Sequence, residues 1–247
     1  MRRVRLVVAY DGTGYHGWQI QPGKATIESK LNEALTSLLG ETIQVIGASR
    51  TDSGVHARGN VAVFDTEGLM PPDKICLAMN QRLPEDIRVQ SSEEVPADWH
   101  PRKCACVKIY EYRILNRRIN MPMERLYSHF CYFKLDAARM QEAADMLVGE
   151  HDFKSFCSVR TQVTDTVRTI YSIDVKRTEN EVITIRVTGS GFLYNMVRII
   201  AGTLMSVGMG QTEPGRMTEI LEARDRRAAG PTAPARGLTL AEMKYDL

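Results

Sequence analysis

One short stretch sets the plan of this chain: Gly47-Ala48-Ser49-Arg50-Thr51-Asp52-Ser53-Gly54-Val55-His56-Ala57. Arg50 and Asp52 lie two residues apart, so on an extended backbone their side chains point to the same side. Ser53-Gly54 predicts a turn, and apolar segments at 42–48 and 60–66 predict strands on either side of the stretch. The guanidinium favours the ionised form of the carboxyl group, which suits Asp52 to nucleophilic attack at neutral pH.

Two residues of this stretch also have a purely structural interpretation. Asp52 can be a turn aspartate whose carboxylate accepts backbone N–H groups. His56 is a lone histidine after a turn, and we leave it out of the catalytic set.

Composition and length bound the class of protein. The chain has 247 residues, of which 43% are hydrophobic and 25% charged, with a net charge of +2. These values are typical of a soluble globular protein of one large or two ordinary domains. The five cysteines include no Cys-x-x-Cys pair, which disfavours a zinc site and suits a reducing cytoplasm. No apolar stretch is long enough to cross a bilayer.

Periodicity and cap residues predict alternating strands and helices. We expect helices at 26–39, 72–82, 136–148, 192–207 and 214–224, the first and third capped by Thr26 and Asp136. Further strands are expected at 3–10, 87–93, 106–115, 167–177, 182–188 and 238–245, with a hairpin around Glu179-Asn180. The fold class is therefore α+β, with two domains of largely antiparallel sheet flanked by helices. We place the domains at 1–103 and 104–247.

The loop after the first strand, residues 11–19, is rich in glycine and aromatic residues. Such a loop often reaches a ligand. The alternative is a packed loop in which Trp18 is buried.

Positive charge and aromatic rings gather around the strand that begins the second half. Six basic residues and one acid, Glu111, lie between Arg102 and Arg118, which favours contact with phosphates. Alternation places Lys108, Tyr110 and Tyr112 on one face. Such a face can hold an unstacked base, at ~1–3 kcal/mol per base. The alternatives are a solvated basic strand and tyrosines packed in a core.

The segment 192–207 carries a single charge, Arg198. A guanidinium inside a helix requires an acceptor, because an unpaired buried charge is costly. No acid lies three or four residues away, and Asp52 is our candidate partner. An ion pair with another acid, or an exposed Arg198 on a phosphate, remains open. Arg224, Arg226 and Arg227 are further candidates for RNA contact.

Taken together, these motifs resemble the tRNA pseudouridine synthase A family. The resemblance rests on residues 47–57 and, in the same order as in the family, on 10–13, 17–19, 108–112, 149–153, 191–198 and 237–240. It covers nearly the whole chain. One departure is Asn60, where glutamine is expected.

The resemblance implies a fold, an activity and a set of residues. The family has two similar α+β halves about a basic cleft and acts as a homodimer. It converts uridine to pseudouridine at positions 38, 39 and 40 of the tRNA anticodon stem-loop, without metal or organic cofactor. By this resemblance Asp52 is the nucleophile, Tyr110 stacks on the target base, and Arg50 and Arg198 surround the carboxylate. We add Lys108 as a substrate-binding residue.

Two other functions stay open at this point. A hydrolase of the N-glycosidic bond could use Asp52, although no second carboxylate lies near it in sequence. A non-catalytic RNA-binding module would need the basic strand and the tyrosines but not Asp52. For the isomerase itself, attack on C1′, attack on C6 of the base and removal of a C2′ proton all remain possible.

Overall fold

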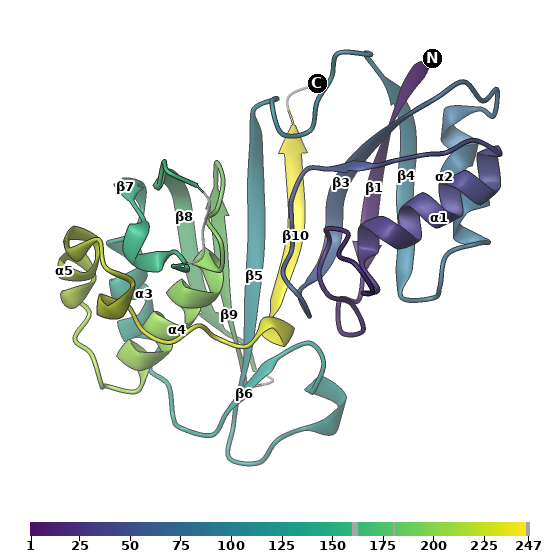
Figure 1. Cartoon of the computed structure of the whole chain (residues 1–247). Helices are drawn as coiled ribbons and strands as arrows, with labels where there is room; N and C mark the ends of the chain where they lie inside the picture. The colour runs from purple at the N-terminus through teal and green to yellow at the C-terminus, as the bar shows by residue number, and fades with distance from the viewer. Residues whose placement is uncertain (160–162, 180, 246–247) are drawn as a thin grey trace. The chain divides into compact units, whose positions relative to one another are not determined.

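The computed structural model describes residues 1–159, 163–179 and 181–245, and Figure 1 shows its helices and strands. The chain forms two compact units. The first contains Met1–Cys106 and the chain from Leu240 onward, and the second contains Val107–Thr239. The boundary expected from sequence puts the last strand with the second domain. From Leu240 onward that strand belongs instead to the first unit.

The first unit is a sheet of long and short strands with two helices. Its strands run in the order β4-β1-β3-β10, and β2 pairs with β3. Both neighbours of β1 are antiparallel to it, and helix α2 packs on β4 and α1. The elements are β1 (Arg2–Tyr10), α1 (Ile27–Leu39), β2 (Ile46–Gly47), β3 (His56–Thr66), α2 (Pro72–Asn80), β4 (Ile87–Val95) and β10 (Leu238–Tyr245).

The second unit repeats this plan with more helix. Its strands run in the order β5-β9-β8-β7 with antiparallel pairing, and β6 pairs with β5 in parallel. The elements are β5 (Cys106–Asn116), β6 (His129–Cys131), α3 (Ala137–Asp145), β7 (Gly149–Asp152), β8 (Val167–Arg177), β9 (Val182–Gly189), α4 (Met196–Gly208) and α5 (Arg216–Ala223). Short 3₁₀ helices cover Pro122–Glu124, Lys154–Phe156, Arg226–Ala228 and Ala235–Gly237. Within the described ranges, no helix has the length and apolar character needed to cross a bilayer.

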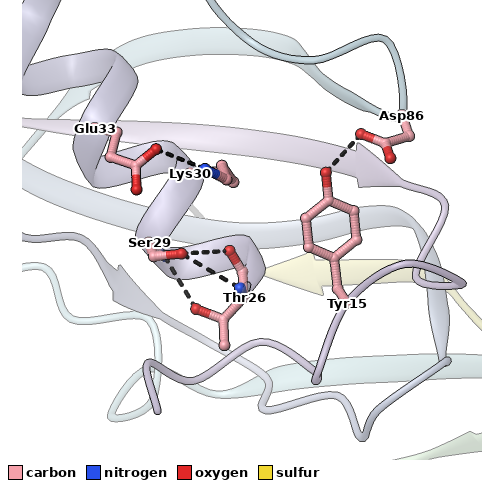
Figure 2. Close-up of polar contacts among 6 residues, drawn as sticks. All are labelled: Tyr15, Thr26, Ser29, Lys30, Glu33 and Asp86. Carbon is pink, nitrogen blue, oxygen red and sulfur yellow. Dashed lines mark hydrogen bonds and ion pairs between the residues drawn. The ribbon is translucent and has the colours of Figure 1, made fainter. Parts of the chain in front are cut away.

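The α+β class and the antiparallel sheets are confirmed. In β1, Val4, Leu6 and Val8 alternate on one face and are fully buried. Thr26 caps α1 as expected. Its hydroxyl accepts from the Ser29 amide at 3.3 Å, and the Ser29 hydroxyl accepts from the Thr26 amide at 3.3 Å (Figure 2). Gly40 ends α1 in the left-handed conformation, with φ 72°.

The strand predicted over 42–48 was mostly wrong, because only Ile46–Gly47 pairs with β3. The segment before it alternates between buried and exposed residues as a strand does. However, the amide of Ile43 donates to Thr36 Oγ1 (3.1 Å) and that of Val45 donates to Asn32 Oδ1 (2.9 Å). Side chains of α1 therefore take the hydrogen bonds that a neighbouring strand would need.

Two helix ends also differ from the prediction. Helix α4 begins at Met196 and not at Phe192, because Asn195 has a left-handed backbone (φ 62°) that no α-helix can contain. Helix α3 stops at Asp145 and not at residue 148, and Gly149 opens β7 with φ 113°. The strands of the predicted hairpin near residue 180 are present as β8 and β9, while Asn180 lies outside the described residues.

Candidate active site

The Asp52 loop (Ala48–Val55) runs from β2 to β3 in the first unit. Along it Arg50 is exposed, Thr51 is buried and Asp52 is half-buried, which is the alternation of an extended backbone. After Asp52 the chain turns: the Val55 amide donates to the Asp52 carbonyl at 3.1 Å, and Gly54 has φ 76°. This is the φ that a type II turn needs at its third residue. The turn leaves the Asp52 side chain at the junction between loop and strand.

A second loop, residues 11–18, fastens the Asp52 loop from one side. The Trp18 amide donates to the Thr51 carbonyl at 3.0 Å, and the Gly54 amide donates to the Tyr15 carbonyl at 3.3 Å. Trp18 is 1% exposed, and its ring lies against Gly47, where a Cβ would come within 2.3 Å of it. Of the two interpretations of this loop, the packed one is therefore correct for Trp18. The Tyr15 hydroxyl ties the same loop to Asp86 at 2.6 Å (Figure 2).

A buried polar cluster lies beneath the Asp52 loop. The Tyr10 hydroxyl is 2.7 Å from Thr51 Oγ1, and Asn60 Nδ2 donates to the Tyr10 hydroxyl (3.1 Å) and to the Ser49 carbonyl (3.0 Å). Sequence reasoning missed the joint role of these residues. The available signal was Asn60 itself, a polar residue within the apolar run of β3.

His56 has the contacts of a structural residue. It is 3% exposed, and its Nδ1 accepts the Gly12 amide at 3.1 Å. Asp11 Oδ1 lies 3.1 Å from the same nitrogen. The histidine thus joins the start of β3 to the loop after β1.

The predicted aromatic strand is β5, in the second unit. Tyr112 is fully buried and donates to the Pro234 carbonyl at 2.9 Å, and burial raises the pKa of its hydroxyl. Tyr112 is therefore a core residue. Tyr110 is 7% exposed, with its ring edge-to-face with Phe192 at 5.2 Å. Lys108 is half-buried at the start of the strand, opposite Gly189 of β9.

Arg198 lies in the first turn of α4 in the second unit and is partly buried. Its Nε donates to the Ala233 carbonyl at 2.8 Å, and one terminal nitrogen donates to Asn195 Oδ1 at 2.7 Å. These two neutral acceptors fix the plane of the guanidinium. Asp52 belongs to the other unit, and its pairing with Arg198 stays a prediction.

The basic cluster around residues 102–118 is less positive than its sequence suggests. Arg113 lies 3.1 Å from Glu124, and Arg117 lies 3.4 Å from Glu181. Both of these acids come from beyond the basic segment. The C-terminal arginines also have partners, since Arg227 pairs with Asp225 at 2.7 Å and Arg224 with Asp152 at 3.2 Å.

Fold and site together define a class: an α+β protein of two units that holds a half-buried carboxylate on a loop fastened from both sides, a construction typical of enzymes. The model of the tRNA pseudouridine synthase family matches residues 6–102 and 143–246. The chain belongs to this family, whose members are isomerases.

Relatives cover the chain from end to end. A protein of Brevibacillus brevis is 49% identical over 246 residues, which is 99% of this chain and 100% of the relative. One of Ruminiclostridium cellulolyticum is 48% identical over 99% of this chain and 100% of its own length. A third, of Bacillus subtilis, is 44% identical over 99% of both chains. All three are named tRNA pseudouridine synthase A.

Proposed function

We propose that this chain converts uridine to pseudouridine at positions 38, 39 and 40 of the tRNA anticodon stem-loop, with Asp52 as the nucleophile. One observation carries the proposal. The loop that matches the family's signature holds Asp52 half-buried between a type II turn and a hydrogen-bonded threonine. A carboxylate held in this way is oriented before the substrate arrives, so little reorganisation is left for the reaction itself.

The reaction needs no redox partner. The C1′–N1 bond of uridine breaks, the uracil turns, and a C5–C1′ bond forms; C5 loses a proton and N1 gains one. The base must first leave its stack, at a cost of a few kcal/mol in a paired stem. Asp52 can assist by attack on C1′, by attack on C6 or by removal of the C2′ proton. Each route starts from the ionised carboxylate.

In this proposal, positively charged side chains stabilise the ionised Asp52 carboxylate and bind the RNA. Arg50 is exposed on the same loop and is available to a phosphate or to Asp52. Arg198, in the second unit, is the other guanidinium that the resemblance assigns to this carboxylate, and Asn195 and Ala233 set its plane. We assign Lys108, also in the second unit, to contact with the RNA backbone. Guanidinium groups stabilise the charged carboxylate before attack and bind phosphate oxygens.

Tyr110 stacks on the flipped base in this proposal. Only 7% of the residue is exposed, and Phe192 packs against its ring. A base therefore reaches the ring only when neighbouring side chains such as Phe192 yield. This requirement makes the site selective for a base that has already left its helix.

We further propose that the enzyme acts in the cytoplasm as a homodimer with tRNA as its partner. The family resemblance supports the dimer, and the free thiols support the compartment, since all five cysteines are unpaired. Sedimentation of the purified chain tests the dimer, and a monomer at micromolar concentration contradicts it.

The proposed activity is tested by incubating purified enzyme with unmodified tRNA and mapping pseudouridine. Wild-type enzyme is expected to modify positions 38–40, while Asp52→Asn binds the same tRNA and forms no product. Normal turnover of Asp52→Asn contradicts the role of Asp52. The matched control is Asp73→Asn, which alters an exposed acid at the start of α2.

The same assay separates the two alternative functions. Isomerisation leaves the mass of the tRNA unchanged, whereas a hydrolase releases free uracil and leaves an abasic site. A binding module leaves tRNA unmodified under all conditions. Mass spectrometry of the recovered tRNA distinguishes all three outcomes.

A further inference from the structure

We propose that Tyr10, Thr51 and Asn60 form a hydrogen-bonded chain that positions Asp52 for reaction. This inference rests on the proposed role of Asp52. The three side chains come from three parts of the first unit: the end of β1, the Asp52 loop and the middle of β3. They are positioning residues, because each acts on Asp52 through the backbone and not on the substrate.

The pattern of donors and acceptors gives the chain a direction. Asn60 Oδ1 accepts the Val61 amide at 2.9 Å, so its nitrogen is the atom that faces Ser49 and Tyr10. An amide nitrogen can only donate. Tyr10 therefore accepts from Asn60, and its own hydrogen is available to Thr51 Oγ1 at 2.7 Å. The order runs from Asn60 through Tyr10 to Thr51, the residue before Asp52.

Because these residues are buried, water cannot easily replace a hydrogen bond that one of them loses. Asn60 is 0% exposed, Tyr10 5%, and Ser49 and Thr51 each 7%. Water has little access to groups at this depth, so each donor or acceptor that loses its partner bears its desolvation cost. Removal of one of these hydrogen bonds is therefore expected to weaken the others in the series from Asn60 to Thr51.

The same atoms fix the backbone on both sides of the reacting group. Asn60 holds the Ser49 carbonyl, Tyr10 holds the Thr51 side chain, and the Trp18 amide holds the Thr51 carbonyl. Beyond Asp52 the turn to Val55 closes the loop. Asp52 is therefore attached to a loop with fixed points on each side, while its own side chain stays half-buried. A displacement of about 1 Å in such a group can cost on the order of 10²-fold in rate.

Asn60 occupies the position where the family resemblance leads us to expect glutamine. The shorter side chain reaches both Ser49 and Tyr10 with one nitrogen. A glutamine here would move its amide outward by one methylene in a fully buried place. The geometry thus assigns Asn60 a specific task in this chain.

The test compares hydroxyl deletions in steady-state kinetics on tRNA. Tyr10→Phe and Thr51→Val each remove one hydroxyl, and we expect kcat to fall about 10-fold with KM little changed. Thr51→Ser keeps the hydroxyl and should restore kcat. Both deletions remove the Tyr10–Thr51 hydrogen bond, and Tyr10→Phe also removes the acceptor for Asn60 Nδ2, so the double variant should lose no more than Tyr10→Phe alone. The matched control is Tyr245→Phe, which loses a hydroxyl bonded to the Pro101 carbonyl at 2.8 Å in the same unit.

Melting temperatures separate positioning from a merely structural role. If Tyr10→Phe and Thr51→Val melt earlier but keep wild-type kcat below their melting range, the positioning role is wrong. It is equally wrong if Thr51→Ser fails to rescue kcat, or if the control loses as much kcat as Tyr10→Phe. Asn60→Asp is a second probe: it keeps the shape, places an acceptor against the Ser49 carbonyl and should lose kcat in the same way. Failure of the proposed function looks different, since the wild-type enzyme then forms no pseudouridine and the positioning role falls with it.

Discussion

A single buried threonine separates the two charged residues of the Asp52 loop. At this scale the sequence predicted that Arg50 and Asp52 lie on one side of an extended backbone, and the structure gives them the expected alternation around Thr51. What lies under Thr51 could not be predicted. Tyr10 lies 41 residues from Thr51 in sequence, and the pairing of β1 with β3 brings it beside Asn60.

Tyr110 offers a test of base stacking. Tyr110→Phe keeps the ring and loses only the hydroxyl, so we expect KM for tRNA to stay within about threefold of wild type. Tyr110→Leu removes the aromatic face, and a loss of ~1–3 kcal/mol of stacking corresponds to roughly 5- to 150-fold weaker binding. Steady-state kinetics and filter binding measure both. Equal losses in the two variants would contradict a stacking role.

Helices and strands match their sequence-based predictions where contacts within the element determine the structure. They differ from the predictions where a group outside the element takes part. Helix α1 has the predicted Thr26 cap and ends at residue 39 as predicted, because the groups that cap and end it act within one turn. The segment before β2 has the right alternation but is not a strand, because Thr36 and Asn32 of α1 take its amides. The late start of α4 likewise follows from the conformation of Asn195, whose side chain binds Ser158 and Arg198.

The capping box of α1 gives a stability prediction. Thr26→Ala removes the hydroxyl that accepts the Ser29 amide, so the free energy of unfolding should fall by about 1 kcal/mol. Thr42→Ala, at an exposed position, is the control and should change it by less than about 0.5 kcal/mol. Urea denaturation measures both. A Thr26→Ala protein as stable as the control would show that the box contributes nothing.

Gly47 tests the contact between β2 and Trp18. A methyl group there would lie within 2.3 Å of the indole, so Gly47→Ala should destabilise the first unit by about 1–3 kcal/mol. Gly14→Ala meets no atom within 4 Å and serves as the matched control. Tryptophan fluorescence during urea unfolding, from Trp18 and Trp99 of the first unit, reports the change. Unchanged stability of Gly47→Ala would mean that the indole can move aside freely.

On the scale of the whole molecule, the sequence predicted the class and the division into two units of like construction, because both follow from local periodicity. It did not predict that the last strand belongs to the first unit. Strand order depends on pairing between residues that are more than a hundred positions apart, as with β3 and β10, and no local pattern encodes it.

Acid should destabilise the first unit by protonating Asp65, which pairs with Arg3. Arg3 bonds Asp65 through two nitrogens at 2.7 Å, directly across β1 and β3, and this hydrogen bonding lowers the pKa of the Asp65 carboxyl from its usual value. A depressed carboxyl pKa gives stability that is present above the pKa of the unfolded chain and is lost as pH falls through the folded value. Asp65→Asn should therefore cost up to about 1 kcal/mol at pH 7, and the difference should shrink below about pH 4.

Urea unfolding at pH 7 and pH 3 measures this difference. Glu85→Gln, at an exposed position, is the control and should show no such dependence. A deficit of Asp65→Asn that persists unchanged in acid would assign it to packing rather than to charge.

The return of β10 has a consequence for how the chain is made. During synthesis residues 1–106 leave the ribosome before the residues from Leu240 onward, so β3 has β1 and β2 as partners but lacks β10 until those later residues follow. The second unit is complete in sequence before the first one is. A newborn chain therefore carries an open strand edge on β3 until the residues of β10 have been made, and a chaperone that binds this edge would prevent its pairing with other chains.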